Sequence, residues 1–277
     1  MATQTSSPDA PETATSASAR ASRHLTYAVR GWFAATALGQ LLFIAFILLF
    51  YYASILPGNF EAWNNKPLIT GYVEGDAVGN RQFAIHVTAA ALMTMAGLIQ
   101  LVPQVRAKWP VLHRWSGRTF LMLAISLAIG GLWLTWVRGS YLNVISAIAI
   151  TMDALLILWF GVMAWRTAVQ RKFAAHRRWA LRTFIVASGV WFMRVGYMIW
   201  AVGTGGLGIG GAMDGPFDRF WGFATYLLPL AVLELYFLAE RGKPATKYAM
   251  ATGLWFGASL ILLGSAGAWL IMWSPYI

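Results

Sequence analysis

Seven long runs of apolar residues constrain this chain more than any other feature of its sequence. A helix needs about 20 apolar residues to cross the hydrocarbon core of a bilayer. The runs cover residues 31–56, 82–103, 119–137, 143–165, 183–203, 219–239 and 248–273. The sequence therefore predicts an all-α integral membrane bundle of about seven transmembrane helices, with its two termini on opposite sides of the membrane.

The composition excludes a purely soluble protein. Hydrophobic residues make up 58% of the 277 residues and charged residues only 11%, whereas soluble domains contain about 25% charged residues. The chain has no cysteine, which excludes disulfides, thiolate metal sites, iron–sulfur clusters and covalently attached c-type haem. No catalytic triad, phosphate-binding loop or metal-ligand spacing points to an ordinary enzyme.

Residues 1–30 form a separate segment that is rich in Ser, Thr, Ala and Pro. The segment has too few large apolar residues to build a core, so we expect a disordered cytoplasmic tail before a transmembrane domain over residues 31–277. The apolar run after Arg30 is longer than the hydrophobic region of a signal peptide, and no small-residue cleavage site precedes polar sequence. We therefore expect this run to remain as a membrane anchor.

Basic residues gather on one side of the apolar runs. The tail and the loops at 104–118, 166–182 and 240–247 contain three, four, six and three of them. The opposite side contains only Lys66, Arg81, Arg138 and Arg219. The positive-inside rule then places the amino terminus in the cytoplasm of a bacterial inner-membrane protein. This accounts for the net charge of +11 without nucleic acid, and it makes the bilayer and its anionic lipids the expected partners.

A seven-residue element occurs twice in the chain. Residues 114–120 and 178–184 share the pattern RW-x-x-RTF at an offset of 64 residues, each near the start of an apolar run. This pattern predicts two duplicated helix hairpins related by an axis along the membrane normal. The alternative is ordinary interfacial sequence, because Arg side chains snorkel and Trp side chains lie at headgroup depth.

Two histidines are candidate cofactor ligands. His113 and His176 lie at one depth, at the cytoplasmic starts of the third and fifth runs, as bis-histidine ligation of a b-type haem requires. The cations near them are Arg114, Arg118, Arg177, Arg178 and Arg182. Guanidinium groups pair with haem propionates, quinone oxygens or phospholipid phosphates. We therefore expect a site for haem b or a quinone here, with Arg118 and Arg182 among its residues, or else an interfacial segment that only holds the loops against lipid.

His86 is a different case, because it interrupts an apolar run near the outer end of the second predicted span. A polar ring at this depth needs a partner, and Gln100 lies too far along the same helix. His86 is also about 26 Å from the depth of the other two histidines if the span is helical. We therefore favour a hydrogen-bonded structural histidine over a cofactor ligand.

Three ionisable residues, Asp153, Arg194 and Glu234, fall inside apolar runs. A charge near the bilayer centre costs at least about 2.5 kcal/mol, so each residue needs a partner. Asp153 and Arg194 lie about 15 and 14 Å below the outer ends of their runs, which predicts an ion pair between them. Glu234 lies about 8 Å from the cytoplasmic end, where we expect it to meet Arg118, Arg182 or a protonated histidine. Such groups form either a proton or ion relay or the structural pairs of a bundle.

The region over residues 80–200 resembles a known family. The residues that carry the resemblance are Phe83-Ala-Ile-His86, Gly97-Leu-Ile-Gln100-Leu, Arg106, the HRW-x-GR element from His113 to Arg118, and a second block with His176, Arg182 and Arg194. Their order resembles the bacterial multi-pass membrane proteins catalogued as domain of unknown function 2306. The resemblance implies a membrane fold and carries no activity. The layout is also loosely similar to dihaem cytochromes b, but it has no second histidine at the depth of His86.

The sequence leaves three functions open. The first is a redox-associated protein that binds haem b or a quinone on its cytoplasmic half. The second is a proton-coupled or small-molecule transporter that uses Asp153, Arg194 and Glu234. The third is a non-catalytic membrane scaffold or assembly factor.

Overall fold

The computed structural model describes residues 10–66, 68 and 70–277, and the regular structure in these residues is helical. The elements are α1 (Ala10–Phe46), η1 (Ile47–Tyr52), α2 (Ala53–Ile55), η2 (Phe60–Asn65), α3 (Ala77–Leu101), α4 (Pro103–Lys108), α5 (Pro110–Trp136), α6 (Val144–Val169), α7 (Phe173–Ala187), α8 (Gly189–Thr204), α9 (Pro216–Glu240), α10 (Pro244–Gly267), η3 (Ala268–Trp273) and η4 (Ser274–Tyr276). The predicted all-α fold class is confirmed.

Six helical segments are long and apolar enough to cross a membrane. They are Ser16–Ile55, Ala77–Leu101, Pro110–Trp136, Val144–Val169, Pro216–Glu240 and Pro244–Tyr276. A seventh crossing is formed if α7 and α8, which meet at an angle of 54°, act as one broken span. The protein is therefore a helical membrane bundle with the predicted number of about seven spans.

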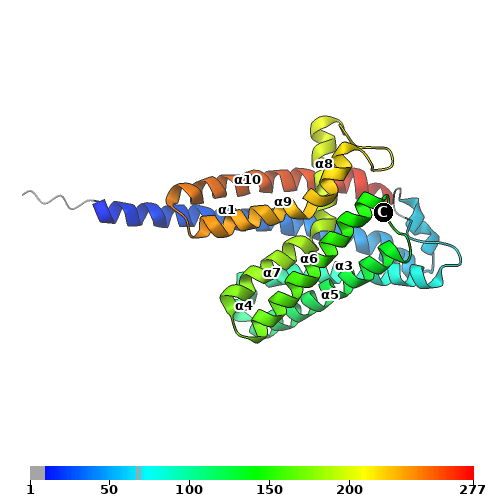
Figure 1. Cartoon of the computed structure of the whole chain (residues 1–277), viewed down its shortest axis with the longest axis horizontal. Coiled ribbons are helices and arrows are strands. Elements are labelled where there is room, and N and C mark those ends of the chain that lie inside the picture. Colours follow the sequence, from blue (N-terminus) through cyan, green and yellow to red (C-terminus); the bar gives the residue numbers. More distant parts are fainter. Residues whose placement is uncertain (1–9, 67, 69) are drawn as a thin grey trace, which may run out of the picture.

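The helices form two groups, which meet where α9 packs against α6 and α7 and where α1 packs against α3, and α8 packs on α9 and α10 (Figure 1). In one group α1 lies along α10 with α9 beside them, and in the other α5 packs between α3 and α6, with α7 against α6. The connections α4, α6–α7 and α9–α10 all lie at one end of the molecule (Figure 1). We call this the basic end, because the wider segments around these connections, residues 104–118, 166–182 and 240–247, contain 13 of the 21 Lys and Arg residues of the chain.

The first helix extends well into the segment for which the sequence predicts a disordered tail. α1 begins at Ala10, and its residues Ala21, Leu25 and Ala28 are buried. Leu25 and Ala28 form a cluster with Ala251 and Leu254 of α10. The spacing of four and three residues between the buried α1 residues is that of a two-helix seam. The disordered tail is therefore wrong for residues 10–30, because small side chains that cannot build a core alone still allow two helices to approach closely. Residues 1–9 lie outside the described part of the chain.

The predicted single helix over residues 183–203 is also wrong. α7 ends at Ala187, and the chain bends at Ser188 before α8 begins. The side chain of Gln40 donates to Ser188 Oγ at 2.9 Å, and Thr225 Oγ1 donates to the carbonyl oxygen of Gly189 at 2.8 Å. Polar groups of this kind satisfy the backbone at a break inside a membrane. They come from α1 and α9, so no local pattern in residues 183–203 signals the break.

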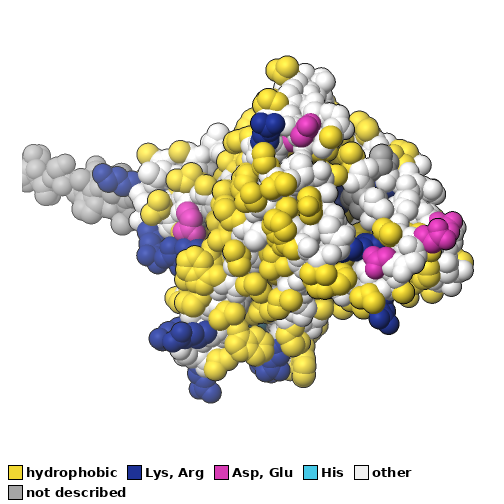
Figure 2. All heavy atoms as spheres, turned by 45° about the vertical axis from the view of Figure 1, so that its right-hand side comes forward, with side chains coloured by type: hydrophobic (Ala, Val, Ile, Leu, Met, Phe, Trp, Pro, Cys, Tyr) yellow, Lys and Arg dark blue, Asp and Glu magenta, His cyan; other side chains and the backbone are white. Residues whose placement is uncertain are grey.

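Large hydrophobic side chains cover the surface between the two ends. Figure 2 shows them over much of the visible central face, with Lys and Arg side chains gathered near the end from which α1 projects. Examples that are at least 44% exposed are Leu92, Met122, Ile129, Ile148, Leu155, Val162, Leu235, Phe256 and Leu263. Apolar surface of this extent is a lipid-facing surface.

Candidate functional site

The basic end contains a group of arginines between α7 and α9, which we call the α7–α9 cluster: Arg177, Arg178, Arg182 and Arg241. Its innermost member, Arg182, forms a two-pronged ion pair with Glu234, with Nε 2.6 Å from Oε1 and an NH2–Oε2 distance of 2.9 Å. The Arg182 guanidinium also lies 4.6 Å from the ring of Trp179. Of the three partners expected for Glu234, the structure selects Arg182.

A second two-pronged pair lies nearer the end of the helices. Arg177 donates to both carboxylate oxygens of Glu240 at 3.1 and 3.0 Å, and also to Tyr236 Oη at 3.0 Å. Fork-to-fork pairs fix orientation as well as distance. Two such pairs therefore hold α7 in one register against α9.

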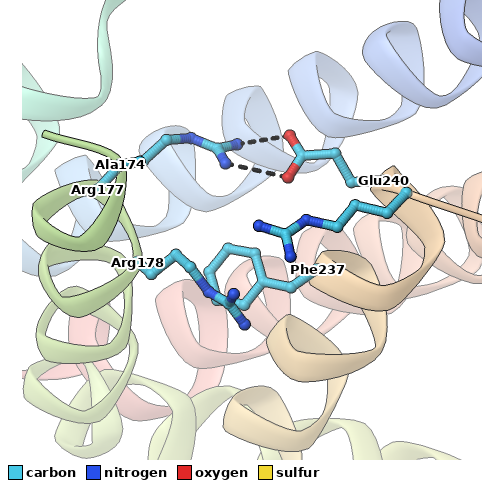
Figure 3. Close-up of a pocket in the computed structure, with 6 residues that line it drawn as sticks. Ala174, Arg177, Arg178, Phe237 and Glu240 are labelled. Carbon is cyan, nitrogen blue, oxygen red and sulfur yellow. Dashed lines mark hydrogen bonds and ion pairs between the residues drawn. The ribbon is translucent and has the colours of Figure 1, made fainter.

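Arg178 lies between these pairs without a carboxylate partner. Its guanidinium is 4.7 Å from the ring of Phe237, and its Nε is buried with no hydrogen-bond partner among the residues that the structure describes. A cavity of about 120 Å³ opens beside it, lined by Ala174, Arg177, Arg178, Phe237, Glu240 and Arg241 (Figure 3). Of the three arginines here, only Arg177 has an acidic partner within the described residues. The cavity is therefore positively charged.

The structure places His113 and His176 within electrostatic range of one another, with Arg106 also near His113. His176 Nδ1 is 2.9 Å from the carbonyl oxygen of Ala164, so Nδ1 carries the proton and donates it, which leaves Nε2 free. His113 Nδ1 is buried and has no hydrogen-bond partner in the described part of the chain.

These contacts test whether the pair suits a b-type haem. The ring nitrogen that does not face the metal normally donates to a carboxylate, carbonyl or water. His176 meets this requirement and His113 does not, so the pair fits bis-histidine ligation at one ring only. No group of three or more His, Cys, Asp or Glu side chains able to hold a metal ion occurs in the described part of the chain.

Arg118 and His86 lie apart from this cluster. The Arg118 guanidinium stacks on the ring of Trp115 at 5.1 Å and has no carboxylate partner among the described residues. His86 lies against the two glycines Gly130 and Gly131 of α5. Its buried Nδ1 has no hydrogen-bond partner in the described part of the chain, so the expected bond at this nitrogen is absent.

The predicted ion pair between Asp153 and Arg194 is wrong. Asp153 Oδ2 lies 2.9 Å from the point where a Cβ on Gly189 would stand, and Oδ1 is buried without a partner. Arg194 instead donates to the carbonyl oxygen of Val190 at 2.8 Å and lies 5.2 Å from the ring of Phe43 on α1. Depth along a helix does not fix rotation about its axis. Asp153 lies beside Gly189 at the start of α8, whereas the Arg194 guanidinium lies against Phe43 of α1.

Sequence reasoning missed four residues that the structure makes important: Gln40, Lys66, Glu240 and Arg241. Gln40 had a visible signal, because it is an amide in the middle of an apolar run. Glu240 and Arg241 follow directly after the last predicted residue of the sixth span, and nothing in their sequence shows that they face Arg177. Lys66 is a lone cation in a polar loop, where a solvated side chain is the ordinary expectation.

Comparison with known proteins agrees with the resemblance seen in the sequence. Residues 83–212 match the family model described as "Predicted membrane protein (DUF2306)". No curated protein and no solved structure matches the chain. The match runs from α3 to the loop after α8, so it includes the three histidines and the α7 arginines and leaves out α1, α9 and α10. Residues 83–212 of this chain are therefore similar to the DUF2306 family of predicted membrane proteins.

Proposed function

We propose that this membrane protein binds the phosphate group of an anionic amphiphile in the α7–α9 cluster. The observation that carries the proposal is the cavity beside Arg178. Three arginines and one glutamate line this cavity, and the buried Nε–H of Arg178 has no acceptor among the described residues. Glu240 is already engaged by Arg177. Arg178 and Arg241 are therefore the cations available to a ligand.

The chemistry of these groups favours a phosphate over a neutral ligand. A guanidinium is always charged and offers donors in a planar fork that matches phosphate oxygens. The ring of Phe237 gives the same cavity an apolar wall. If the basic loops face the cytoplasm, the cavity lies at the anionic leaflet, where each cation adds about 1 kcal/mol of attraction to the surface.

Lipid-dependent stability tests this proposal. The melting temperature of the purified protein in mild detergent is measured by tryptophan fluorescence after addition of phosphatidylglycerol, phosphatidylcholine or inorganic phosphate. We expect phosphatidylglycerol to stabilise the protein more than phosphatidylcholine, and Arg178→Gln and Arg241→Gln to remove the difference. Stabilisation by inorganic phosphate as well would identify the headgroup as the recognised part.

The matched control is Arg166→Gln, which removes an exposed arginine at the same end of the molecule. This variant should keep the preference for the anionic lipid. Equal stabilisation by both lipids, or an undiminished preference in Arg241→Gln, would contradict the proposal. Arg241 is exposed, so its variant tests the site even if Arg178→Gln does not fold.

The broken span favours a second candidate function, proton-coupled transport through Asp153. Discontinuous helices near the bilayer midplane form ion and substrate sites in many transporters. Here Gln40 donates a hydrogen bond to Ser188 at the break, and Asp153 lies beside the next residue, Gly189. An unpaired ionisable residue within a span is a functional-site hypothesis by default.

Proton flux in proteoliposomes tests this second candidate. An internal pH dye reports acidification after an imposed pH gradient or addition of candidate substrates. We expect Asp153→Asn to abolish a flux that the wild-type protein supports, because the amide cannot take up and release a proton. Glu74→Gln, at an exposed loop position, is the control. Equal flux in wild type and Asp153→Asn would remove Asp153 from any relay.

A further inference from the structure

Two cations at the end of the molecule opposite the basic end lie together without an acidic partner. Lys66, which follows η2, is only 8% exposed, and Arg194 lies on α8 within electrostatic range of it. The three ion pairs in the described part of the chain involve neither residue. We call these two residues the Lys66–Arg194 cluster.

Aromatic rings surround this cluster. Lys66 Nζ lies 5.7 Å from the ring of Tyr276, and the Arg194 guanidinium lies 5.2 Å from the ring of Phe43. The ring of Trp273 packs against Phe43 with centroids 5.4 Å apart. Aromatic faces attract cations but carry no net charge. These aromatic rings therefore surround the two cations without neutralising their charge.

Most polar side chains in this region are hydrogen-bond donors, and the Tyr51 hydroxyl, which lies within electrostatic range of Arg194, can donate as well as accept. Arg194 makes one hydrogen bond among the described residues, to the Val190 carbonyl oxygen of its own helix. Trp273 is fully buried, and its Nε1–H has no acceptor among the described residues. A buried donor without an acceptor lowers stability by roughly 1–3 kcal/mol. An ammonium, a guanidinium and an indole N–H together would therefore be stabilised by a ligand that accepts hydrogen bonds.

The backbone around the cluster is unusual as well. The segments η1 and η3, which lie at the ends of α1 and α10, are both π-helical. The rings of Phe46, directly before η1, and Trp273, in η3, stack with centroids 5.7 Å apart. π-helical turns are rare and frequently occur at functional sites. Both lie near the cluster, because Tyr51 of η1 is within electrostatic range of Arg194 and Trp273 of η3 packs on Phe43. They are a second sign of a ligand site.

The electrostatics of Lys66 agree with this geometry. Burial, together with the positive charge of Arg194, lowers the pKa of Lys66 to about 8. No carboxylate near Lys66 opposes these effects. A bound anion would supply the missing negative charge and offset the cost of burying the two cations.

We infer that the Lys66–Arg194 cluster binds a small monovalent anion, such as chloride or a short carboxylate, between α8, η3 and the loop after η2. The Lys66 ammonium, the Arg194 guanidinium and the Trp273 indole N–H are its donors. A small anion suits the site because bulky aromatic side chains enclose it. This inference concerns the opposite end of the molecule from the α7–α9 cluster and does not depend on the proposed function.

Equilibrium binding of radiolabelled chloride and radiolabelled acetate to the purified protein in detergent tests the inference. We expect saturable binding of at least one anion with one site per chain. Lys66→Met and Arg194→Met should weaken that binding at least tenfold, whereas Lys66→Arg, which keeps the charge, should retain it. Saturation by one anion alone would support the inference and identify the preferred ligand.

The matched control is Arg81→Met, which removes an exposed cation, unlike the buried Lys66, from the same end of the molecule. It should bind the anion as the wild-type protein does. Absence of saturable binding for both anions would overturn the inference. Undiminished binding by Lys66→Met would overturn it too, and because Lys66 lies in a loop, this variant decides the question if Arg194→Met does not fold.

Discussion

Phe120 and Phe184 pack against one another with their ring centroids 6.3 Å apart, although they occupy the same position in the two copies of the RW-x-x-RTF element. Equivalent positions of a duplicated unit meet where the axis that relates the two copies passes. Gly97 and Gly161 have the same offset of 64 residues, and both lie at close contacts between helices. These relationships support the duplicated hairpins expected from the sequence, with α3 and α5 as one copy and α6 and α7 as the other.

The first prediction concerns Gly97, at the centre of this contact. A Cβ added at Gly97 would lie 3.0 Å from the ring of Phe120 and 3.2 Å from the ring of Phe184. Both rings are at most 5% exposed and pack on each other, so neither can move away. We expect Gly97→Ala to lower the free energy of unfolding by roughly 1–3 kcal/mol, measured by detergent denaturation.

The control for this prediction is Gly253→Ala on α10. A Cβ at Gly253 would meet no atom within 4 Å, and alanine is the better helix former. This variant should be as stable as the wild-type protein or slightly more stable. A Gly97→Ala protein of unchanged stability would show that the two rings are less closely packed than the structure has them.

The second prediction compares the two ion pairs between α7 and α9. The Arg182 side chain is 16% exposed, whereas the Arg177 side chain is 43% exposed. Pairs in exposed positions couple weakly because of screening and lost side-chain entropy. We expect a double-mutant cycle of Arg182→Gln and Glu234→Gln to give a coupling of roughly 1–2 kcal/mol, and the corresponding cycle for Arg177 and Glu240 roughly 0.5 kcal/mol or less.

The same detergent denaturation measures both cycles, so each pair serves as the control of the other. Equal coupling for the two pairs, or stronger coupling for the outer pair, would contradict this prediction. Such a result would mean that the outer pair is as well shielded as the inner one.

Most of the membrane architecture could be predicted from the sequence. Hydropathy depends on the local composition of about 20 residues. It therefore gave the seven apolar runs and a predicted fold without strands. The runs in turn placed the two histidines at one expected depth. The helix over residues 10–30 did not follow. Its stability comes from packing on α10, and α10 lies more than 200 residues further along the chain.

The candidate sites were harder to predict because they depend on rotation and bending of helices. Asp153 and Arg194 were assigned similar depths on neighbouring predicted spans, but depth arithmetic contains no information about the face on which each residue lies. The break at Ser188 depends on side chains from α1 and α9. Arg182 was one of the three partners expected for Glu234, and it is the partner in the structure. The expectation could be this narrow because Glu234 and these partners lie near the ends of helices at the same side of the bundle.

The third prediction concerns orientation in the membrane, and the absence of cysteine makes it simple to test. Basic loops stay on the cytoplasmic side during insertion. Gln170 lies exposed in the α6–α7 connection at the basic end, and Glu74 lies exposed in the loop at the opposite end. We expect Glu74→Cys to react with a membrane-impermeant maleimide in intact cells, and Gln170→Cys to react only after the membrane is opened.

Each of these two variants controls for the reactivity of the other, since both positions are exposed. The reverse pattern of labelling would place the α7–α9 cluster on the non-cytoplasmic side. The proposed binding of an anionic amphiphile would then lose the contribution of the anionic leaflet, although the cavity itself would be unchanged.

The last prediction is a rise in stability at alkaline pH that depends on Lys66. The pKa of Lys66 is lowered to about 8 from its ordinary value of 10.5, so between these values the unfolded chain keeps a proton that the folded protein has lost. Stability rises with pH wherever the unfolded state binds more protons. At 1.36 kcal/mol per pKa unit, we expect a gain of roughly 1–2 kcal/mol between pH 8 and 9.5, measured at low anion concentration. Below about pH 8, Lys66 carries its proton in both states and contributes no slope.

Lys66→Met should remove this rise, whereas Lys243→Met, at an exposed position of the basic end, should keep it. Saturating chloride or acetate should also flatten it, because an anion beside the ammonium raises the pKa of Lys66 toward the value in the unfolded chain. A rise that persists in Lys66→Met would assign the titration to another group. A rise that is unaffected by anions in the wild-type protein would separate the buried lysine from anion binding, because the same charge cannot be neutralised by a ligand and still titrate as if it were alone.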